Sequence, residues 1–417
     1  MPCALVIAAS YLARLSLLRT RTFDPDEFEH LHAAWEFHRG LLPFRDFFEH
    51  HMPGMYYLLA AMLGGFDVTN RVSDALHFLF VARTAMWGIT GGIVLLTVLL
   101  GARVGGRIVG WISGALLSLS IVFVARTLEI RPDVPGLAFW VASQVAFMYA
   151  LAPTRLPGGR RLFFAVGGLC LGCALLFTQK ILLAGPGFAM FALLYLASRV
   201  PASSLASRVV DIATLLAGCA LPLALLVAHF WTNHAVADLV RGVLTNNLGW
   251  PQEVEAAATI RWMLLRDPLL CAAAVAGLLQ TAFVVIRREH DWMAQAVVLL
   301  PTASVVAGLA IIPTPYPQYL MLTFPAAAAW GAAYVWKTAQ SGAVSPWRSG
   351  GAERLMLLAT CAVVAAVGLA VARPVFRHPL VYPLFGGAAL GTAIACARAR
   401  RPAWSRSSGI ANTVRPS

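Results

Sequence analysis

The residues best suited to chemistry are concentrated between positions 23 and 53. This stretch contains seven of the 19 acidic residues and five of the 10 histidines of the chain. Because 59% of the chain is hydrophobic, so polar a stretch indicates a functional region: ionisable groups are costly near a membrane and usually serve a function there. Carboxylates can act as general bases, and together with histidines they can bind divalent metal ions.

Four acids open this stretch: Asp24, Asp26, Glu27 and Glu29. An acid in the first turn of a helix also interacts favourably with the positive end of the helix dipole. That explanation is sufficient for Asp26 or Glu27 taken singly. Four acids together exceed what capping a helix requires, which favours a chemical role.

The residues around these acids predict a short helix that positions them. Asp24 suits the N-cap, Pro25 suits the first helical position, and Glu27 completes a capping box. Gly40 predicts the end of the helix after about Arg39. The predicted apolar face consists of Phe28, Leu31, Trp35 and Phe37 or His38. We therefore expect an amphipathic helix that lies on a bilayer surface.

The composition predicts a polytopic membrane protein. The chain has 417 residues, of which only 12% are charged, and its mean hydropathy is +0.72. The net charge is +13, but the basic residues are scattered singly between apolar runs, so no nucleic-acid partner is expected. The seven cysteines lie in or beside apolar runs, where packing explains them better than redox chemistry or zinc binding.

The apolar runs predict an all-α bundle of about twelve membrane spans, in one domain over residues 1–397. The expected spans are about 3–18, 78–101, 107–124, 133–152, 162–178, 181–198, 209–230, 268–286, 293–312, 318–336, 355–372 and 381–397. Two long outer loops connect these spans, the first at 19–77 and the second at 231–268. The apolar part of the first loop, 55–66, is expected to dip into the membrane interface. Residues 338–353 are predicted to be an inner linker, and 398–417 a basic, disordered cytoplasmic tail.

The distribution of arginines predicts the orientation of the bundle. With the N-terminus inside, the inner loops carry the following basic residues: Arg103, Arg107, Arg155, Arg160, Arg161, Arg199, Arg208, Arg287, Arg288, Lys337, Arg348 and Arg354. Most acids then fall in outer loops, as the positive-inside rule requires. We expect the acidic loop to face the periplasm or exterior of a bacterial inner membrane.

Several other outward residues are candidates for substrate binding. They are Arg45, Asp46, Glu49, His50, His51, Arg131, Asp133, Lys180, Tyr316, Gln318 and Tyr319. Some have simpler explanations, since Asp133 can begin a helix, Arg131 can snorkel, and the tyrosines can belong to an interfacial aromatic belt.

A divalent metal ion is a possible cofactor. Glu27 and His30, three residues apart on the predicted helix, are its candidate ligands. Neighbouring histidines usually point in different directions, so His50 and His51 are not expected to share a metal.

Four stretches carry a resemblance to a known family. They are Asp26-Glu27 with the following His-Leu-His-Ala-Ala-Trp, residues 40–54 (Gly-Leu-Leu-Pro-Phe-Arg-Asp-Phe-Phe-Glu-His-His-Met-Pro-Gly), and the later Arg-Pro-Asp at 131–133 with 316–325. They resemble the GT-C glycosyltransferases, and are most similar to protein O-mannosyltransferases, lipid A aminoarabinose transferases and galacturonosyltransferase-like bacterial proteins. The detailed match covers the first 80 residues. Gln318 departs from the pattern, because relatives often have arginine there.

The resemblance implies a membrane glycosyltransferase with a GT-C-like fold. The enzyme would move a hexosyl or pentosyl group from a polyprenyl-phosphate donor to a lipid, glycan or protein acceptor at the outer face, with inversion. It also implies that Asp26 is the catalytic base and that Glu27 helps to position acceptor or ion. A polytopic secondary transporter is the alternative, but it would need ionisable groups near mid-membrane, and the predicted spans hold few.

Overall fold

The computed structural model describes residues 2–152, 159–198, 204–289, 291–309, 311–312 and 314–344. Within these ranges the chain is helical, without a β-strand; the only pairing there is an isolated bridge between Pro43 and Phe47. The predicted all-α class is confirmed. The predicted spans at 355–372 and 381–397 and the predicted tail at 398–417 lie outside the described residues.

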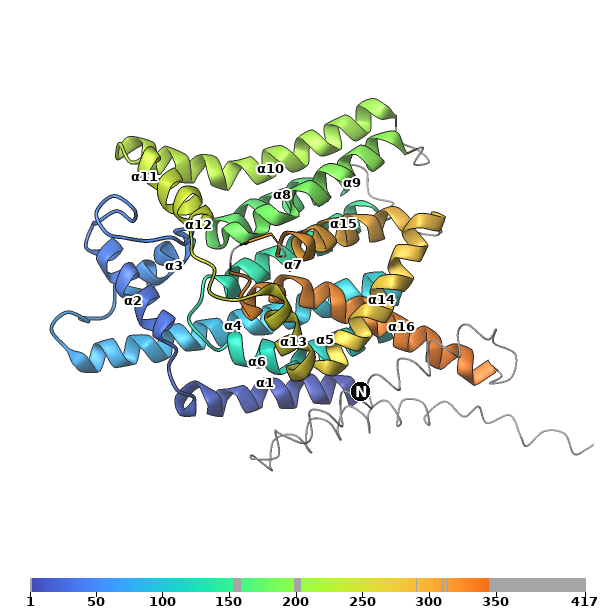
Figure 1. Ribbon diagram of the computed structural model, residues 1–417, viewed down its shortest axis with the longest axis horizontal. Coiled ribbons are helices and arrows are strands. Elements are labelled where there is room, and N and C mark those ends of the chain that lie inside the picture. The colour runs from blue at the N-terminus through green and yellow to red at the C-terminus, as the bar shows by residue number, and fades with distance from the viewer. Residues whose placement is uncertain are drawn as a thin grey trace, which may run out of the picture.

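The long helices run side by side along the molecule, and short helices gather at one end (Figure 1). In chain order the elements are α1 (Pro2–Thr20), α2 (Pro25–His38), α3 (Gly54–Leu63), α4 (Val72–Gly105), α5 (Arg107–Leu119), α6 (Ile121–Arg126), α7 (Asp133–Ala150), α8 (Gly159–Phe177), η1 (Gln179–Ala184), α9 (Gly185–Ala197), α10 (Leu205–Thr232), α11 (Val236–Val240), η2 (Arg241–Thr245), α12 (Asn246–Leu248), α13 (Ala256–Arg266), α14 (Pro268–Arg287), α15 (Trp292–Leu309), η3 (Pro317–Thr323) and α16 (Phe324–Val344).

Within the described ranges, seven helices are long and apolar enough to cross a membrane. They are α1, α4, α8, η1 with α9, α10, α14 and α15. This agrees with a multi-pass membrane protein. The helix α16 continues to Val344, so the predicted inner linker at 338–353 begins as helix.

The predicted span at 107–124 is interrupted. Helix α5 ends at Leu119, and Ser120 caps the short helix α6 by accepting a hydrogen bond from the backbone N–H of Phe123. The carboxylate of Asp267 accepts hydrogen bonds from the Ser120 hydroxyl and from the N–H of Ile121 at 2.8 and 2.6 Å. A buried carboxylate therefore holds the break in place, and the chain after it can turn toward the first outer loop.

Helix α2 has the predicted ends, and part of its polar side is buried. Asp24 is its N-cap, both hydrogen bonds of the capping box with Glu27 are present, and Gly40 follows with φ of +89°. Yet Glu27 and His30 are buried, whereas Phe28 is 52% exposed. Ion pairing and packing draw Glu27 and His30 into the protein, while Phe28 of the predicted apolar face stays exposed, so contact of that face with a bilayer stays a prediction.

Helix α3 packs into the protein, and the expectation that residues 55–66 dip into the membrane interface stays a prediction. Met55, Tyr56 and Leu59 are fully buried, and the helix contacts α2, α4 and α8. Gly54 approaches the backbone carbonyl of Leu176 so closely that a Cβ there would overlap it. This contact attaches the predicted first outer loop to the C-terminal end of α8.

Helices α8 and α10 pack closely against each other. Gly168 and Gly172 of α8 face backbone carbonyls of α10, and Gly218 of α10 faces the carbonyl of Ala165, with no room for a Cβ at any of the three. Small residues at such positions let two helix backbones approach, as is common within membranes.

Candidate active site

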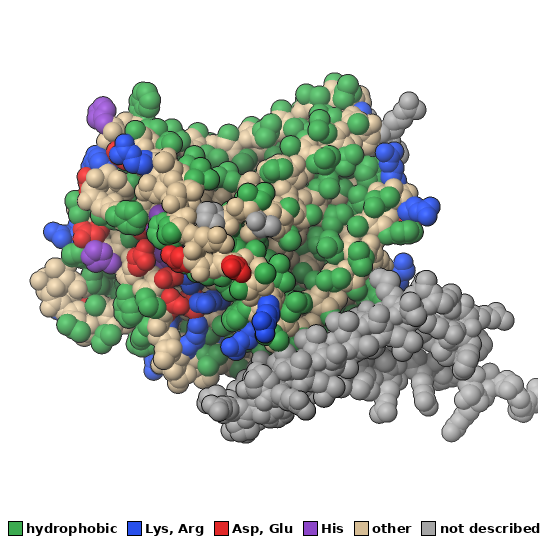
Figure 2. All heavy atoms as spheres, viewed as in Figure 1, with side chains coloured by type: hydrophobic (Ala, Val, Ile, Leu, Met, Phe, Trp, Pro, Cys, Tyr) green, Lys and Arg blue, Asp and Glu red, His purple; other side chains and the backbone are tan. Residues whose placement is uncertain are grey.

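Acidic side chains gather at one end of the bundle, over the short helices and the connections between them (Figure 2). The first outer loop, the segment between α6 and α7, the element η1 and the second outer loop all meet there. Gln179 of η1 and Asn247 of α12 both donate hydrogen bonds to the backbone carbonyl of His50, at 3.0 and 2.7 Å. Residues far apart in sequence are therefore fixed around the loop that contains His50.

Glu27 is fully buried and has no free acceptor site. Arg83 of α4 binds it bidentately at 2.8 and 2.6 Å, and the N–H groups of Asp24 and Ile130 donate to it at 2.9 and 3.2 Å. A carboxylate offers about four acceptor positions, and four donors fill them. Glu27 therefore connects α2 to α4 and to the segment before α7.

Glu129 is the centre of a second buried network. Its carboxylate accepts hydrogen bonds from Arg21, from Arg126 at 3.0 Å and from Arg131 at 3.0 Å. Arg126 also pairs with the N-cap residue Asp24 at 3.2 Å. Three arginines around one acid leave positive charge directed at the start of α2.

Asp26 differs from these acids because it reaches solvent. One of its oxygens, Oδ2, pairs with Nη2 of Arg131, and the side chain of Asp26 is 41% exposed whereas that of Arg131 is 7% exposed. A buried arginine thus fixes the orientation of a carboxylate whose other oxygen is available. Of the predicted catalytic pair, only Asp26 has this geometry.

Asp133 and Lys180 form a buried pair beside Arg131. The ammonium of Lys180 lies 2.8 and 3.0 Å from the two oxygens of Asp133, and it lies 3.6 Å from the ring centroid of Tyr319. Thr178 also donates to Asp133, at 3.3 Å. The structure therefore brings together three predicted substrate-binding residues: Asp133, Lys180 and Tyr319.

A cluster of two carboxylates and two imidazoles lies beside α2. The possible ligand atoms of Glu29, Glu49, His50 and His51 all lie within 4.8 Å of one another. The rings of His50 and His51 have centroids 3.9 Å apart, so the expectation that they point apart was wrong. The ring of Trp250 stacks on His50 with the ring centroids 4.9 Å apart. Glu49 accepts hydrogen bonds from the backbone N–H groups of His50 and His51. These contacts together hold the loop in this shape.

The protonation states of this cluster suit a cation. Burial lowers the pKa of His50 to about 4, and nearby His51 adds to the effect. Burial alone raises the pKa of Glu49, but the hydrogen bond from His51 and its charge lower the pKa to about 2. Burial and then Glu49 raise the pKa of Glu29. At neutral pH His50 is a neutral imidazole and Glu49 a carboxylate, which are the forms that bind metal.

The cluster passes a further test as a metal site. Nδ1 of His50 is buried and has no hydrogen-bond partner among the described residues, as expected of a nitrogen kept for a ligand. Two carboxylates with two imidazoles suit zinc or a similar divalent ion. The predicted Glu27–His30 pair is less suited, because the oxygens of Glu27 are already occupied. His30 stacks edge-to-face on His51 at 5.0 Å, and its burial lowers its pKa well below the ordinary value.

The remaining predicted residues lie around this centre. Arg45 pairs with its neighbour Asp46 at 2.8 Å and donates to the carbonyl of Asn233 at 3.0 Å, so both stabilise the loop. The hydroxyl of Tyr316 bonds Glu253. Gln318 is 8% exposed, and its Oε1 has no partner among the described residues.

Sequence reasoning missed Arg83 and Trp250 as parts of the site. Arg83 had a detectable signal, because it falls inside the predicted span at 78–101, where an arginine needs a partner. Nothing local in the sequence distinguishes Trp250.

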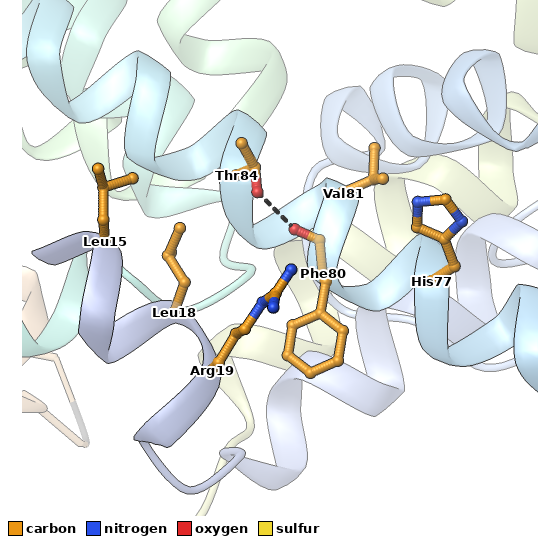
Figure 3. A pocket seen from close by; sticks show the side chains of 7 residues that line it. All are labelled: Leu15, Leu18, Arg19, His77, Phe80, Val81 and Thr84. Carbon is orange, nitrogen blue, oxygen red and sulfur yellow. Dashed lines mark hydrogen bonds between the residues drawn. The ribbon is translucent and has the colours of Figure 1, made fainter.

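A hollow of about 330 Å³ lies between the C-terminal part of α1 and the N-terminal part of α4 (Figure 3). Leu15, Leu18, Phe80 and Val81 line it together with Arg19, and the hydroxyl of Thr84 donates to the Phe80 carbonyl there at 2.8 Å. None of the predicted site residues lines this hollow, so no part of the chemistry is assigned to it.

Solved structures show what this arrangement is similar to. ArnT from Cupriavidus metallidurans, bound to undecaprenyl phosphate, aligns with a TM-score of 0.61 at 13% identity, over 94% of this chain and 75% of ArnT. The archaeal oligosaccharyltransferase AglB from Archaeoglobus fulgidus, in complex with an inhibitory peptide and a dolichol-phosphate, aligns with a TM-score of 0.58 at 13% identity, over 94% of this chain and 56% of AglB. An AglB complex with Zn and sulfate aligns with a TM-score of 0.54.

The chain has the GT-C glycosyltransferase fold. The resemblance drawn from the first outer loop is thereby confirmed at the level of fold. No protein-family model matches the chain, and no curated protein matches its sequence. The chain spans about half the length of AglB, 56%.

Proposed function

We propose that the protein transfers a sugar from a polyprenyl-phosphate donor to an acceptor hydroxyl or amide at the outer face of the membrane. The observation that carries this proposal is the Asp26–Arg131 pair: a solvent-reaching carboxylate oriented by a buried guanidinium. The fold supports it, because ArnT was solved with undecaprenyl phosphate and AglB with a dolichol-phosphate. The acceptor class is a lipid, a glycan or a protein.

Asp26 is the proposed general base. Its free oxygen accepts the proton of the acceptor as the acceptor atom attacks the anomeric carbon of the sugar. The new bond to that carbon forms as the bond to the phosphate oxygen breaks, and the bonding electrons pass to the phosphate. One base and one displacement give inversion at the anomeric carbon.

The leaving phosphate gains negative charge, and cations near Asp26 stabilise it. Arg131 and Lys180 are the nearest candidates in the buried layer, since both also contact the acids at this site. A divalent ion held by Glu29, Glu49, His50 and His51 would supply further positive charge to the phosphate. We propose Glu27 as a positioning residue rather than a reacting one, because Arg83 and two backbone amides fill its acceptor sites.

A transfer assay tests the function. Purified protein is mixed with undecaprenyl-phosphate-linked hexoses and pentoses and with a membrane extract as the source of acceptor. Mass spectrometry follows the release of undecaprenyl phosphate and the gain of sugar mass on the acceptor. Release and gain together support the proposal, and the absence of both with every donor would contradict it.

A further inference from the structure

Far from the candidate active site, arginines surround a single buried acid where α8 and α10 begin. Nε of Arg160 lies 2.9 Å from Oδ2 of Asp211, and Nε of Arg161 lies 3.9 Å from Oδ1. Asp211 is fully buried and also accepts a hydrogen bond from the Tyr195 hydroxyl at 2.8 Å. Arg160 donates to the hydroxyl of Ser207 at 2.6 Å.

Arg208, three residues before Asp211 on α10, brings a third positive charge. Arg208 is buried, with 8% of the residue exposed. Its Nε and Nη1 nevertheless have no hydrogen-bond partner in the part of the chain that the structure describes. A buried, unsatisfied charged group is strongly unfavourable. One carboxylate cannot neutralise three guanidinium groups, so this group of side chains has an excess of positive charge. We term it the inner arginine cluster: Arg160, Arg161 and Arg208.

Two helix N-termini add to this positive charge. Helix α8 begins at Gly159 and α10 at Leu205, and the two helices pack closely along their length. The first N–H groups of a helix lack partners within it, and its dipole places partial positive charge there. At α10 the Ser204 side chain satisfies one such group, the N–H of Ser207.

The inner arginine cluster lies at the opposite end of α8 from the candidate active site. The 19 residues from Gly159 to Phe177 span about 28 Å, which is close to the thickness of a hydrocarbon core, about 30 Å. Thr178, directly after this helix, bonds Asp133 of the candidate active site. Basic side chains without acidic neighbours appear at the end of the molecule away from the acids (Figure 2). The predicted orientation puts this end at the cytoplasmic leaflet.

The surface next to the cluster is apolar. Leu162 and Val166 on α8 and Val209 on α10 are 61%, 40% and 50% exposed, so they face the bilayer. A ligand that places a phosphate on arginines and hydrocarbon on these side chains is a phospholipid. Basic pockets between membrane helices are known to suit anionic headgroups.

We propose that the inner arginine cluster binds the phosphate of an anionic phospholipid. The phosphate bonds Nε and Nη1 of Arg208 and lies at the N-termini of α8 and α10, while Arg161, the most exposed of the three arginines, contacts the rest of the headgroup. The acyl chains lie against Leu162 and Val209. This site is independent of the proposed transfer reaction.

Lipid-dependent stabilisation tests the site. The full chain is purified in detergent and titrated with phosphatidylglycerol, with phosphatidylcholine, or with sodium phosphate, and the thermal midpoint and the lipid retained in native mass spectra are measured. We expect phosphatidylglycerol to stabilise the protein more than the other two. Removing one arginine with R208Q or R161Q should weaken phosphatidylglycerol binding about fivefold. R161Q removes an exposed arginine and so keeps the test valid if R208Q does not fold.

The matched control is R287Q, which removes an exposed arginine from the end of α14, where Arg287 lies over Phe283. It should leave phosphatidylglycerol binding unchanged. If R287Q weakened phosphatidylglycerol binding as much as R161Q and R208Q do, the lipid would be held by the general positive charge of this surface, and the proposal would be overturned. Equal stabilisation by sodium phosphate would assign the site to free phosphate, and equal binding of both lipids would exclude recognition of anionic headgroups. Unchanged binding in R161Q and R208Q would also reject the site.

Discussion

Asp26→Asn separates catalysis from folding at the candidate active site. Asp24, not Asp26, is the N-cap of α2, so the substitution leaves the cap in place. Asp26 pairs with Arg131 through one oxygen, and its side chain is 41% exposed. Asparagine has nearly the same shape and retains one carbonyl oxygen that can accept a hydrogen bond from Arg131.

The two effects of this change differ in size. An ion pair with one partly exposed partner contributes about 0–1 kcal/mol, so we expect a loss of stability no greater than about 1 kcal/mol. Loss of a general base lowers turnover by roughly 10²–10⁴-fold. The variant should therefore fold, insert and bind the donor lipid while losing most of its transfer activity.

The assay measures sugar transfer from a polyprenyl-phosphate donor by wild type and D26N at equal folded concentration. Its control is D67N, because Asp67 lies in the same outer loop, is 42% exposed and pairs with Arg71 at 4.0 Å. D67N should transfer sugar at nearly the wild-type rate. Equal rates for D26N and wild type would refute the assignment of the base, and Asp46, Glu29 or Glu49 would be substituted next.

Three further outcomes follow from the same geometry. Glu27→Gln leaves the buried Arg83 without its charge partner and should destabilise the protein by about 3–5 kcal/mol, seen as a lower thermal midpoint; wild-type stability would contradict the role given to Glu27. Lys180→Ala should lower turnover by roughly 10²-fold. The effect should exceed that of Arg45→Ala, because the guanidinium of Arg45 pairs with Asp46. Equal turnover of the two variants would remove Lys180 from phosphate binding. In a chelating buffer, stability should fall as pH is lowered from 6.5 toward 4, because the unfolded chain then binds a proton that the half-buried His50, with its pKa of about 4 in the folded protein, does not bind; a flat profile of unfolding midpoints against pH would argue against it.

The sequence alone determined the elements and the position of the polar region. The start of α2 at Asp24 and its end before Gly40 follow from capping, which depends on residues three or four positions apart. Hydrophobic runs of sufficient length predict membrane helices, and most predicted spans have a matching helix in the described chain. The break at Ser120 escaped prediction, because its stabilising partner Asp267 is 147 residues away.

Only the tertiary structure decided which acid is free to react. Asp26 and Glu27 are adjacent and look equivalent in sequence, but α4 brings Arg83 onto Glu27 and the segment before α7 brings Arg131 onto Asp26. Which side of α2 faces the protein was settled by these distant arginines rather than by its own apolar residues. Likewise, His50 and His51 converge with Glu49 because Trp250 and Asn247 of the second outer loop hold their segment in place. Ion pairs between segments a hundred residues apart depend on how helices pack, and that packing has no local signal in the sequence.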